Sequence, residues 1–292
     1  MRIAVTGATG FVGRAVAERL QLEHHVTRYG RRPGVEHWDI TKGTHEGTFD
    51  AVVHCAALAD DWVPLGDAML ANRIGTRNVV ASFPDARIVH ISTSSVYDAF
   101  VPSVRVREDA APVHRFLSSY SESKTAAEAE LLGADAVILR PHAVYGPGDT
   151  TLLPRLLAGI RGDRLTLPEG AAVSHTLTHI DNLVDAVLLS LSGPVGVYNI
   201  GDDTDVLLSA VLTEFLHRRG RPDIALRSIP YRAAFAAAAA LEQLSRAGGR
   251  RPRITRYAVS QLGLERTLDL SAARERLGYD PRPTSLAGAE QW

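Results

Sequence analysis

Two residues one helical turn apart, Tyr120 and Lys124, have the types and the spacing needed for proton transfer. Residues 120–128 are mostly good helix formers, and positions i and i+4 lie on the same face of a helix. A phenol ordinarily has a pKa of about 10, and a nearby ammonium group favours its ionised form. We therefore expect Lys124 to lower the pKa of Tyr120 toward the range of general acid–base catalysis. The alternative is an ordinary Tyr–Lys pair on a helix surface. Lys124 is one of only two lysines in a chain that otherwise uses arginine, which favours a specific role.

A cluster of hydroxyl side chains at residues 92–97 includes Thr93 and Ser94 and follows the apolar run 87–91, which predicts a buried strand. Hydroxyl clusters at strand ends usually cap backbone turns. This one follows a strand of a predicted parallel sheet, and ligands bind at the carboxyl ends of such strands. The sequence therefore favours a role for Thr93 and Ser94 in a site.

A glycine-rich turn joins the first predicted strand, residues 3–5, to a helix that begins near residue 12. Gly7 permits a tight turn, Gly10 allows close approach of a pyrophosphate, and Gly13 allows the helix to pack on the strand. The start of the helix offers unpaired N–H groups and a positive dipole to an anion. An ordinary βα turn is the alternative, but the position at the first strand of a βαβ pattern predicts a dinucleotide site.

The second predicted strand, residues 25–29, is followed by Gly30, Arg31 and Arg32 and by no carboxylate that could bind the adenosine ribose. Guanidinium groups suit a 2′-phosphate, so we favour NADP(H) over NAD(H). Two solvated loop arginines are the alternative. Asp39, after a third short strand, is placed to meet the adenine edge.

Alternating strands and helices along the rest of the chain predict an α/β fold: a Rossmann-type doubly wound parallel sheet with a smaller, mostly helical C-terminal substrate-binding domain interleaved with it. We expect residues 1–148 plus about 175–201 in the dinucleotide-binding domain, and about 149–174 plus 202–292 in the substrate-binding domain. Residues 175–180 alternate like one strand, and residues 71–82 have helical spacing. The basic, glycine-rich residues 246–253 are either a solvated loop or a lid that contacts an anionic substrate group.

The composition excludes several classes of function. A net charge of -1 over 292 residues gives no electrostatic reason to bind nucleic acid or an anionic membrane. One cysteine, Cys55, allows no internal disulfide, and we see no signal peptide or membrane span, so we expect a cytoplasmic protein. His175 and His179 on one strand would lie roughly 13 Å apart, too far to share a metal, so no metal is expected. A serine hydrolase is also disfavoured, because we can place no histidine beside the serine cluster.

The chain resembles the extended short-chain dehydrogenase/reductases, a group also labelled the NAD-dependent epimerase/dehydratase family. The matching stretches follow one another along nearly the whole chain: TGATGFVG (6–13), DI (39–40), HCAA (54–57), NRIGTRNV (72–79), STSSVY (92–97), YSESK (120–124), RPHAVYGPG (140–148) and LSAARERLGY (270–279). Residues 140–154 and 254–257 are similar to a narrower branch, the 3β-hydroxysteroid dehydrogenase-like and 2-alkyl-3-ketoalkanoate reductase-like enzymes.

The resemblance implies roles for individual residues. Tyr120 would be the general acid/base, Lys124 would lower its pKa and hold the nicotinamide ribose, and Thr93, with Ser94 as its neighbour and alternative, would bond the substrate oxygen. The residues that would bind the cofactor are Gly7, Thr9, Gly10, Phe11, Val12, Gly13, Arg31, Arg32, Asp39, Ile40, Cys55, Ala56, Ala57, Asn72, Tyr120, Lys124, Pro141 and Val144.

Three functions remain open at this point. The first is an NAD(P)-dependent oxidoreductase that interconverts a secondary alcohol and a ketone of a small molecule. The second is a nucleotide-sugar epimerase or dehydratase with tightly bound NAD, and the third is a non-catalytic cofactor sensor on the same fold. Members of the family often dimerise through the tyrosine-bearing helix, so a homodimer is one expectation.

Overall fold

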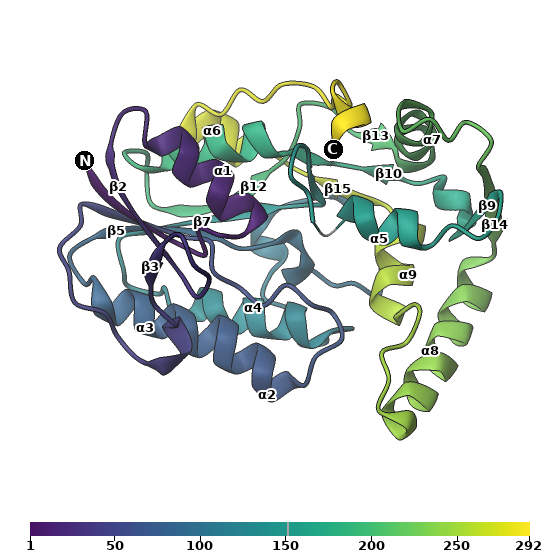
Figure 1. The fold of residues 1–292 in the computed structure, drawn as a ribbon, viewed down its shortest axis with the longest axis horizontal. Coiled ribbons are helices and arrows are strands. Elements are labelled where there is room, and N and C mark those ends of the chain that lie inside the picture. The colour runs from purple at the N-terminus through teal and green to yellow at the C-terminus, as the bar shows by residue number, and fades with distance from the viewer. Residues whose placement is uncertain (151) are drawn as a thin grey trace.

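The computed structural model describes residues 1–150 and 152–292, which form a large lobe around one sheet and a second lobe of helices and short sheets (Figure 1). The first half of the chain contains β1 (Arg2–Thr6), α1 (Phe11–Leu20), β2 (His25–Gly30), β3 (Glu36–His37), β4 (Ala51–His54), α2 (Leu65–Ala68), α3 (Gly75–Ser82), β5 (Arg87–Ile91), β6 (Ser103–Val106), α4 (Ser119–Ala129), β7 (Ala136–Pro141) and β8 (Val144–Tyr145). The second half contains α5 (Leu152–Ala158), β9 (Arg164–Pro168), β10 (Ser174–His175), β11 (Thr178–His179), α6 (Ile180–Ser190), β12 (Gly196–Ile200), β13 (Val206–Leu207), α7 (Leu208–Arg218), β14 (Ala225–Ile229), α8 (Tyr231–Gly248), α9 (Arg256–Gly263) and β15 (Arg266–Leu268).

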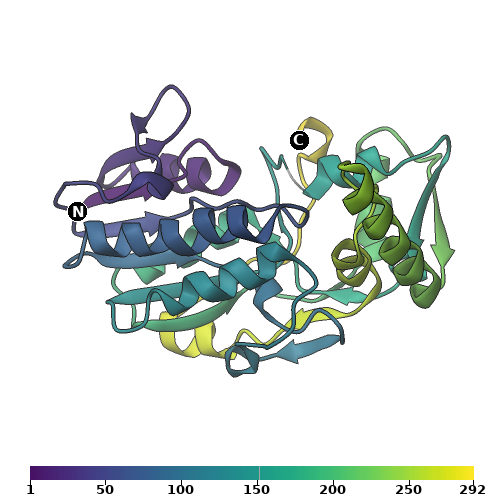
Figure 2. The same ribbon diagram turned by 90° about the horizontal axis from the view of Figure 1, so that it is seen from below.

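The central sheet has the strand order β12-β7-β5-β4-β1-β2-β3, and all of its pairs are parallel. Helices α1 and α6 cover one face, and α3 and α4 cover the other (Figures 1 and 2). Since both faces are covered, the inner strands are apolar along their whole length: β4 is fully buried, and β1 is buried after its first residue. The order reverses between β1 and β4, so the switch point where ligands bind in such sheets lies at the ends of these two strands. The predicted doubly wound α/β fold is confirmed.

The second lobe differs from the expectation of a mostly helical domain. Helices α5, α7, α8 and α9 are present, but so are a four-stranded sheet, β13-β10-β15-β6, and the pair β14-β9. The single strand expected at residues 175–180 is also wrong: β10 pairs with β13 and β15, whereas β11 pairs with β8. Pairing with strands distant in sequence sets these short elements, and their local pattern does not reveal it.

Three features show how closely the lobes interleave. Strand β12 returns to the central sheet beside β7, as expected. Strand β6 leaves the first half of the chain to pair with β15. Ala273, Leu277 and Tyr279, expected in the second domain, pack in the main core with residues of β1, α1 and α6.

The helix expected at 71–82 begins earlier: α2, a π-helical segment (Met69–Ile74) and α3 form one continuous helix after Pro64. No helix in the described residues is long and apolar enough to cross a membrane.

The helix that carries Tyr120, α4, is fixed to the sheet by a buried ion pair. Arg140 of β7 donates to Glu128 through Nε (2.9 Å) and Nη2 (2.6 Å), and the two side chains are only 4% and 11% exposed. Arg140 also donates to the hydroxyl of Tyr97 and to the carbonyl oxygen of Glu108. The bidentate geometry defines both the height and the rotation of α4 on the sheet.

We expect Glu128→Gln to lower the free energy of unfolding by about 3 kcal/mol, because removing one partner leaves a buried guanidinium without its counter-charge. Glu122→Gln on the same helix is the control, since Glu122 forms no ion pair among the described residues, and we expect a change below about 1 kcal/mol. Urea denaturation followed by circular dichroism measures both. Equal values for the two variants would contradict the importance given to the buried pair.

Candidate active site

The glycine-rich turn at the start of α1 has the shape of an anion site. Gly7 has φ +67°, and a Cβ there would lie 2.7 Å from the Ala56 backbone, while one at Gly13 would lie 2.3 Å from the Gly7 oxygen. Gly10 is the exposed N-cap of α1 and has no side chain that could cap the helix. The first backbone N–H groups of α1, including those of Phe11 and Val12, therefore remain available to a ligand. These observations fit the pyrophosphate of a dinucleotide.

The carboxyl end of β4 lies beside this turn. Cys55 and Ala56 follow the strand, and the Gly7 turn packs against their backbone without an intervening side chain. Ala57, the next residue in the chain, is exposed. Burial raises the pKa of the Cys55 thiol to about 12, so this cysteine is an inert lining residue.

Arg31 and Arg32 lie exposed after β2, and neither side chain forms an ion pair or hydrogen bond within the described residues. The Thr9 side chain lies beside Gly30: a Cβ atom added to Gly30 would be 3.5 Å from the hydroxyl oxygen of Thr9. Asp39 does not present a free carboxylate: it caps the short helix Ile40–Lys42 and accepts from the N–H and hydroxyl of Thr41. These bonds hold the pKa of Asp39 below its usual value. Ile40 is buried against Gly75.

Local bonds position the first turn of α4. Ser118 caps the helix by accepting from the Ser121 N–H (3.2 Å), and the Ser119 hydroxyl donates to the Val63 carbonyl (2.8 Å). The polar run at 118–121 is therefore a helix start, joined to the loop that follows β4. This arrangement directs Tyr120 toward the carboxyl edge of the sheet, beside the hydroxyl cluster.

Lys124 is fully buried, and its ammonium group donates to His90 Nε2 (2.9 Å) and to the Ile91 carbonyl (2.8 Å). Burial lowers its pKa to about 8, opposed by the charge of Glu128. Two of its three protons are thus engaged by the end of β5, and one remains for a ligand. A buried ammonium of this kind is not a surface residue, so the alternative of a surface Tyr–Lys pair is wrong.

The expected effect of Lys124 on Tyr120 differs from what the structure shows. Burial raises the pKa of Tyr120, and a hydrogen bond with Thr93, rather than the Lys124 ammonium, is the influence that opposes it. The ammonium is directed to the end of β5, where His90 and a carbonyl neutralise part of its field. Spacing on one helix face brought the two residues near each other but could not give the direction of the lysine side chain.

The hydroxyl cluster after β5 forms a short 3₁₀ turn, Ser94–Val96, that Thr93 caps. The hydroxyl of Thr93 donates to Ser95 Oγ (3.0 Å) and accepts from the Ser95 N–H (3.1 Å). The cluster therefore caps a backbone turn, and its role in a site stays a prediction.

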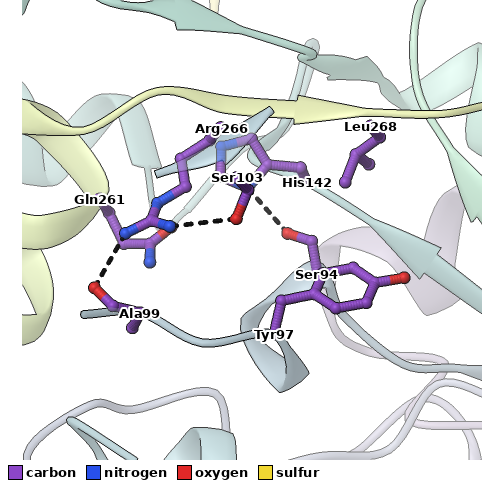
Figure 3. A pocket seen from close by; sticks show the side chains of 8 residues that line it. All are labelled: Ser94, Tyr97, Ala99, Ser103, His142, Gln261, Arg266 and Leu268. Atoms are coloured by element: carbon purple, nitrogen blue, oxygen red, sulfur yellow. Dashed lines mark hydrogen bonds between the residues drawn. The ribbon is translucent and has the colours of Figure 1, made fainter. Parts of the chain in front are cut away.

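Ser94 has a partner that sequence reasoning missed. His142 Nδ1 lies 2.8 Å from Ser94 Oγ, and His142 Nε2 lies 3.1 Å from His175 Nδ1. Ser94 and His142 border a cavity of about 10 Å³, room for one water, which Arg266 also lines (Figure 3). Burial holds the pKa of both histidines well below the usual value, so the chain is neutral. No carboxylate orients it, which sets it apart from a Ser-His-Asp triad.

Asn72 and His54 have structural roles. Asn72 is buried, and its amide accepts from the Leu58 N–H and donates to the Leu58 carbonyl and to Ser123 Oγ. These bonds hold the loop after β4 against α4, and the assignment of Asn72 to the cofactor stays a prediction. His54, which ends β4, is bonded at both nitrogens to the hydroxyls of Thr6 and Thr76.

The remaining candidates lie at the edge between the lobes. Pro141 ends β7 and is buried, and Val144 lies in β8 beside Thr178. In the described residues no group of histidine, cysteine or carboxylate side chains could hold a metal ion.

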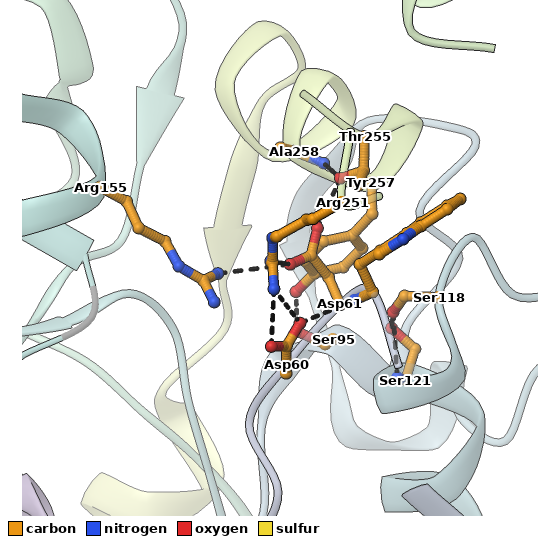
Figure 4. Close-up of polar contacts among 11 residues, drawn as sticks. Asp60, Asp61, Ser95, Ser118, Ser121, Arg155, Arg251, Thr255, Tyr257 and Ala258 are labelled. Carbon is orange, nitrogen blue, oxygen red and sulfur yellow. Dashed lines mark hydrogen bonds and ion pairs between the residues drawn. The ribbon is translucent and has the colours of Figure 1, made fainter. Parts of the chain in front are cut away.

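One arginine of the basic segment after α8 forms ion pairs within the protein. Arg251 pairs with Asp60 (2.7 Å) and with Asp61 (2.8 Å), two residues of the loop after β4 (Figure 4). Arg155 also approaches Asp61 (3.3 Å), and the Arg246 guanidinium lies 5.5 Å from the centre of the Trp62 ring. We call residues 249–255 the strap, because they connect the second lobe to the large lobe beside Tyr120.

Comparison with known proteins gives a consistent result. Residues 3–201 match the model of the NAD dependent epimerase/dehydratase family. The chain is 32% identical to 4-hydroxy-2-methyl-3-oxo-4-farnesyl-3,4-dihydroquinoline-1-oxide ketoreductase of Stigmatella aurantiaca, covering 99% of this chain and 95% of the relative. It is 30% identical to 2-alkyl-3-oxoalkanoate reductase of Shewanella oneidensis, covering 94% and 81%. UDP-glucuronic acid 4-epimerase from Bacillus cereus, solved with NAD, has the same fold, with a TM-score of 0.71 at 22% identity over 99% and 94% of the two chains.

The chain therefore belongs to the NAD-dependent epimerase/dehydratase family of extended short-chain dehydrogenase/reductases, and it is an NAD(P)-dependent enzyme.

The buried histidines predict a steep loss of stability in mild acid. Burial lowers the pKa of His54 and of His175 to about 3, whereas an unfolded chain binds a proton on each near pH 6.5. Between these values the unfolded state holds more protons, so stability falls as the pH falls, by about 1.4 kcal/mol per pH unit for each such histidine. Urea denaturation from about pH 7.5 to pH 5.5 measures the slope. We expect His175→Asn to make it shallower by about one histidine's share, and His114→Asn, at an exposed position, to leave it unchanged.

Proposed function

We propose that the chain is an NADP(H)-dependent reductase that converts the ketone of a small molecule into a secondary alcohol, with Tyr120 as the general acid. The observation that carries the proposal is the position of Tyr120 on α4 at the carboxyl edge of the sheet: one turn later on this helix, Lys124 donates to the carbonyl oxygen of Ile91 (2.8 Å), which ends β5 just before the hydroxyl cluster that contains Thr93. The edge lies at the end of the parallel strands, next to a glycine turn that fits a dinucleotide.

Each residue then has a distinct task. The bound dinucleotide supplies the hydride. Tyr120 donates its phenolic proton to the carbonyl oxygen as negative charge develops there, and Thr93 orients that oxygen by hydrogen bonding. Lys124, whose ammonium keeps one free proton, would hold a ribose hydroxyl and supply a fixed positive charge under the site.

The relatives favour reduction of a 3-oxo compound. The two relatives at 30% identity or more are named for a ketoreductase and a 3-oxoalkanoate reductase, and both matches cover more than nine-tenths of this chain. The epimerase structures are less similar, below 25% identity, and support the fold alone. We therefore infer that the substrate carries a ketone next to a substituted carbon, as those names describe.

We expect Tyr120→Phe to lower kcat by at least about 100-fold, since it removes the proton donor and keeps the ring. Reduction of 2-alkyl-3-oxoalkanoates, followed by the loss of NADPH absorbance, measures turnover. NADPH affinity, measured by fluorescence titration, should stay within a few-fold because the ring still packs. A variant that retains full turnover would disprove the assignment of Tyr120.

The cofactor preference is tested on the purified protein. Because Arg31 and Arg32 are exposed and unpaired beside the predicted ribose, we expect NADPH to bind more tightly than NADH. Replacing both by alanine should weaken NADPH about 10- to 100-fold and leave NADH unchanged, since only the 2′-phosphate bonds are lost. Denaturation should release little dinucleotide; near-stoichiometric NAD would instead indicate an epimerase or dehydratase that retains its cofactor.

A further inference from the structure

Arg266, on β15, is a buried cation without a counter-charge. The residue is only 5% exposed, and it forms no ion pair with any carboxylate among the described residues. Asp98 is the one carboxylate whose field stabilises its charge, and Asp98 is itself paired with Arg115 at 2.6 Å. Because a buried charge without a partner is costly, this guanidinium suits a site that takes up an anion.

Uncharged groups hold the guanidinium in place. Its two Nη atoms donate at 2.5–3.1 Å to the carbonyl oxygens of Ala99 and Val101 and to the hydroxyls of Ser103 and Ser260. Its Nε–H, by contrast, has no hydrogen-bond partner among the described residues. Four dipoles therefore fix the position of the group without neutralising it, and one of its five donors stays unused.

The small cavity that Arg266 lines is the place where such an anion fits. Ser94 and His142 border the same cavity (Figure 3), and no side chain that lines it is acidic. Its volume of about 10 Å³ is room for one water, and a single carboxylate oxygen is of similar size. Burial keeps the pKa of His142 far below its usual value, so the histidine adds no second charge. The cavity thus has one positive charge and no negative one.

The cavity adjoins the residues proposed for the reaction. Ser94, which borders it, follows Thr93 directly in the chain, and the Cα atoms of neighbouring residues are about 3.8 Å apart. In a 3-oxo acid, one carbon separates the ketone carbon from the carboxylate carbon. A carboxylate at the cavity would therefore leave the ketone near Thr93, whereas an ester would bring no charge to Arg266.

We propose that Arg266 and Ser94 form a subsite for the carboxylate of the substrate, so that the enzyme selects a free 3-oxo acid over its ester. The inference rests on the proposed function, because it places the carboxylate relative to the ketone that Tyr120 would protonate. Arg266 stabilises the carboxylate by its charge. Neutral His142 donates from Nδ1 to Ser94 Oγ, 2.8 Å away, and this leaves the serine proton for the carboxylate.

The first test compares an acid with its methyl ester in the wild type. The pair is a 2-alkyl-3-hydroxyalkanoate and its ester, oxidised with NADP⁺, because free 3-oxo acids lose carbon dioxide spontaneously. We expect kcat/KM to be about 10- to 100-fold higher for the acid, the worth of one charge-assisted hydrogen bond. Oxidation of both compounds with equal kcat/KM would overturn the subsite and leave the reductase assignment intact.

Variants of the cavity wall locate this preference. Gln261 lines the cavity together with Arg266, so Gln261→Glu supplies a carboxylate from the protein itself. We expect this variant to lose the preference for the acid and to melt at a higher temperature, because the buried guanidinium gains a counter-charge. Arg266→Gln should lose the preference as well. Gln243→Glu, at an exposed position of α8, is the matched control and should keep it. An unchanged preference in Gln261→Glu would contradict the proposal.

Binding without turnover separates failure of the subsite from failure of the reaction. The acid and the ester are titrated by calorimetry into the NADPH complex, in which neither can be oxidised. If the wild type oxidises neither compound, the proposed function fails, and tighter binding of the acid that Gln261→Glu abolishes would still support the subsite. Sodium chloride is the probe for a free inorganic ion. A melting temperature that rises with chloride, while the acid and the ester bind equally, would mean that the cavity takes up a free ion and would overturn the proposal.

Discussion

The position of α4 on the central sheet is the constraint on which the site depends. Its buried Glu128 receives two bonds from Arg140 of β7, so neither the height nor the rotation of the helix can drift. One turn earlier Lys124 fills the space over β5, and one turn before that Tyr120 meets Thr93. Three successive turns thus have three different partners. The bonds that fix the helix and the residues proposed for the reaction lie on one helix face.

Burying Lys124 requires its surroundings to stay neutral or negative. Among the described residues, His90 is the one side chain that accepts a hydrogen bond from Lys124, and burial and the ammonium both lower the pKa of His90 far below the usual value. His54, 5.0 Å from the His90 ring, is kept neutral in the same way. A protonated histidine here would place two cations in a region without water, which costs several kcal/mol. The core below the site is therefore built to tolerate exactly one positive charge, that of Lys124.

Much of this could be predicted from the sequence because it depends on local pattern. Gly7 takes a positive φ and Gly13 packs on the Gly7 backbone within one βα turn, and the parallel order follows from strand–helix alternation. What could not be predicted depends on pairing between distant segments: His142 beside Ser94, and Tyr257 beside Ser95. No periodicity identifies such partners. The direction of the Lys124 side chain could not be predicted for a related reason. Spacing on one helix face brings two residues near each other, but the acceptors that the sheet offers determine where the ammonium group points.

The contacts between the strap and the large lobe are ionic, and this choice has a physical consequence. Arg251 is 45% exposed, but the Asp61 side chain that it bonds is only 6% exposed. Loss of the guanidinium would leave a nearly buried carboxylate without this counter-charge, which costs more than the loss of an exposed surface pair. The same strap leads into α9, whose Tyr257 lies 2.5 Å from Ser95 Oγ. The ion pairs of the strap and this contact therefore join the second lobe to the large lobe at the hydroxyl cluster.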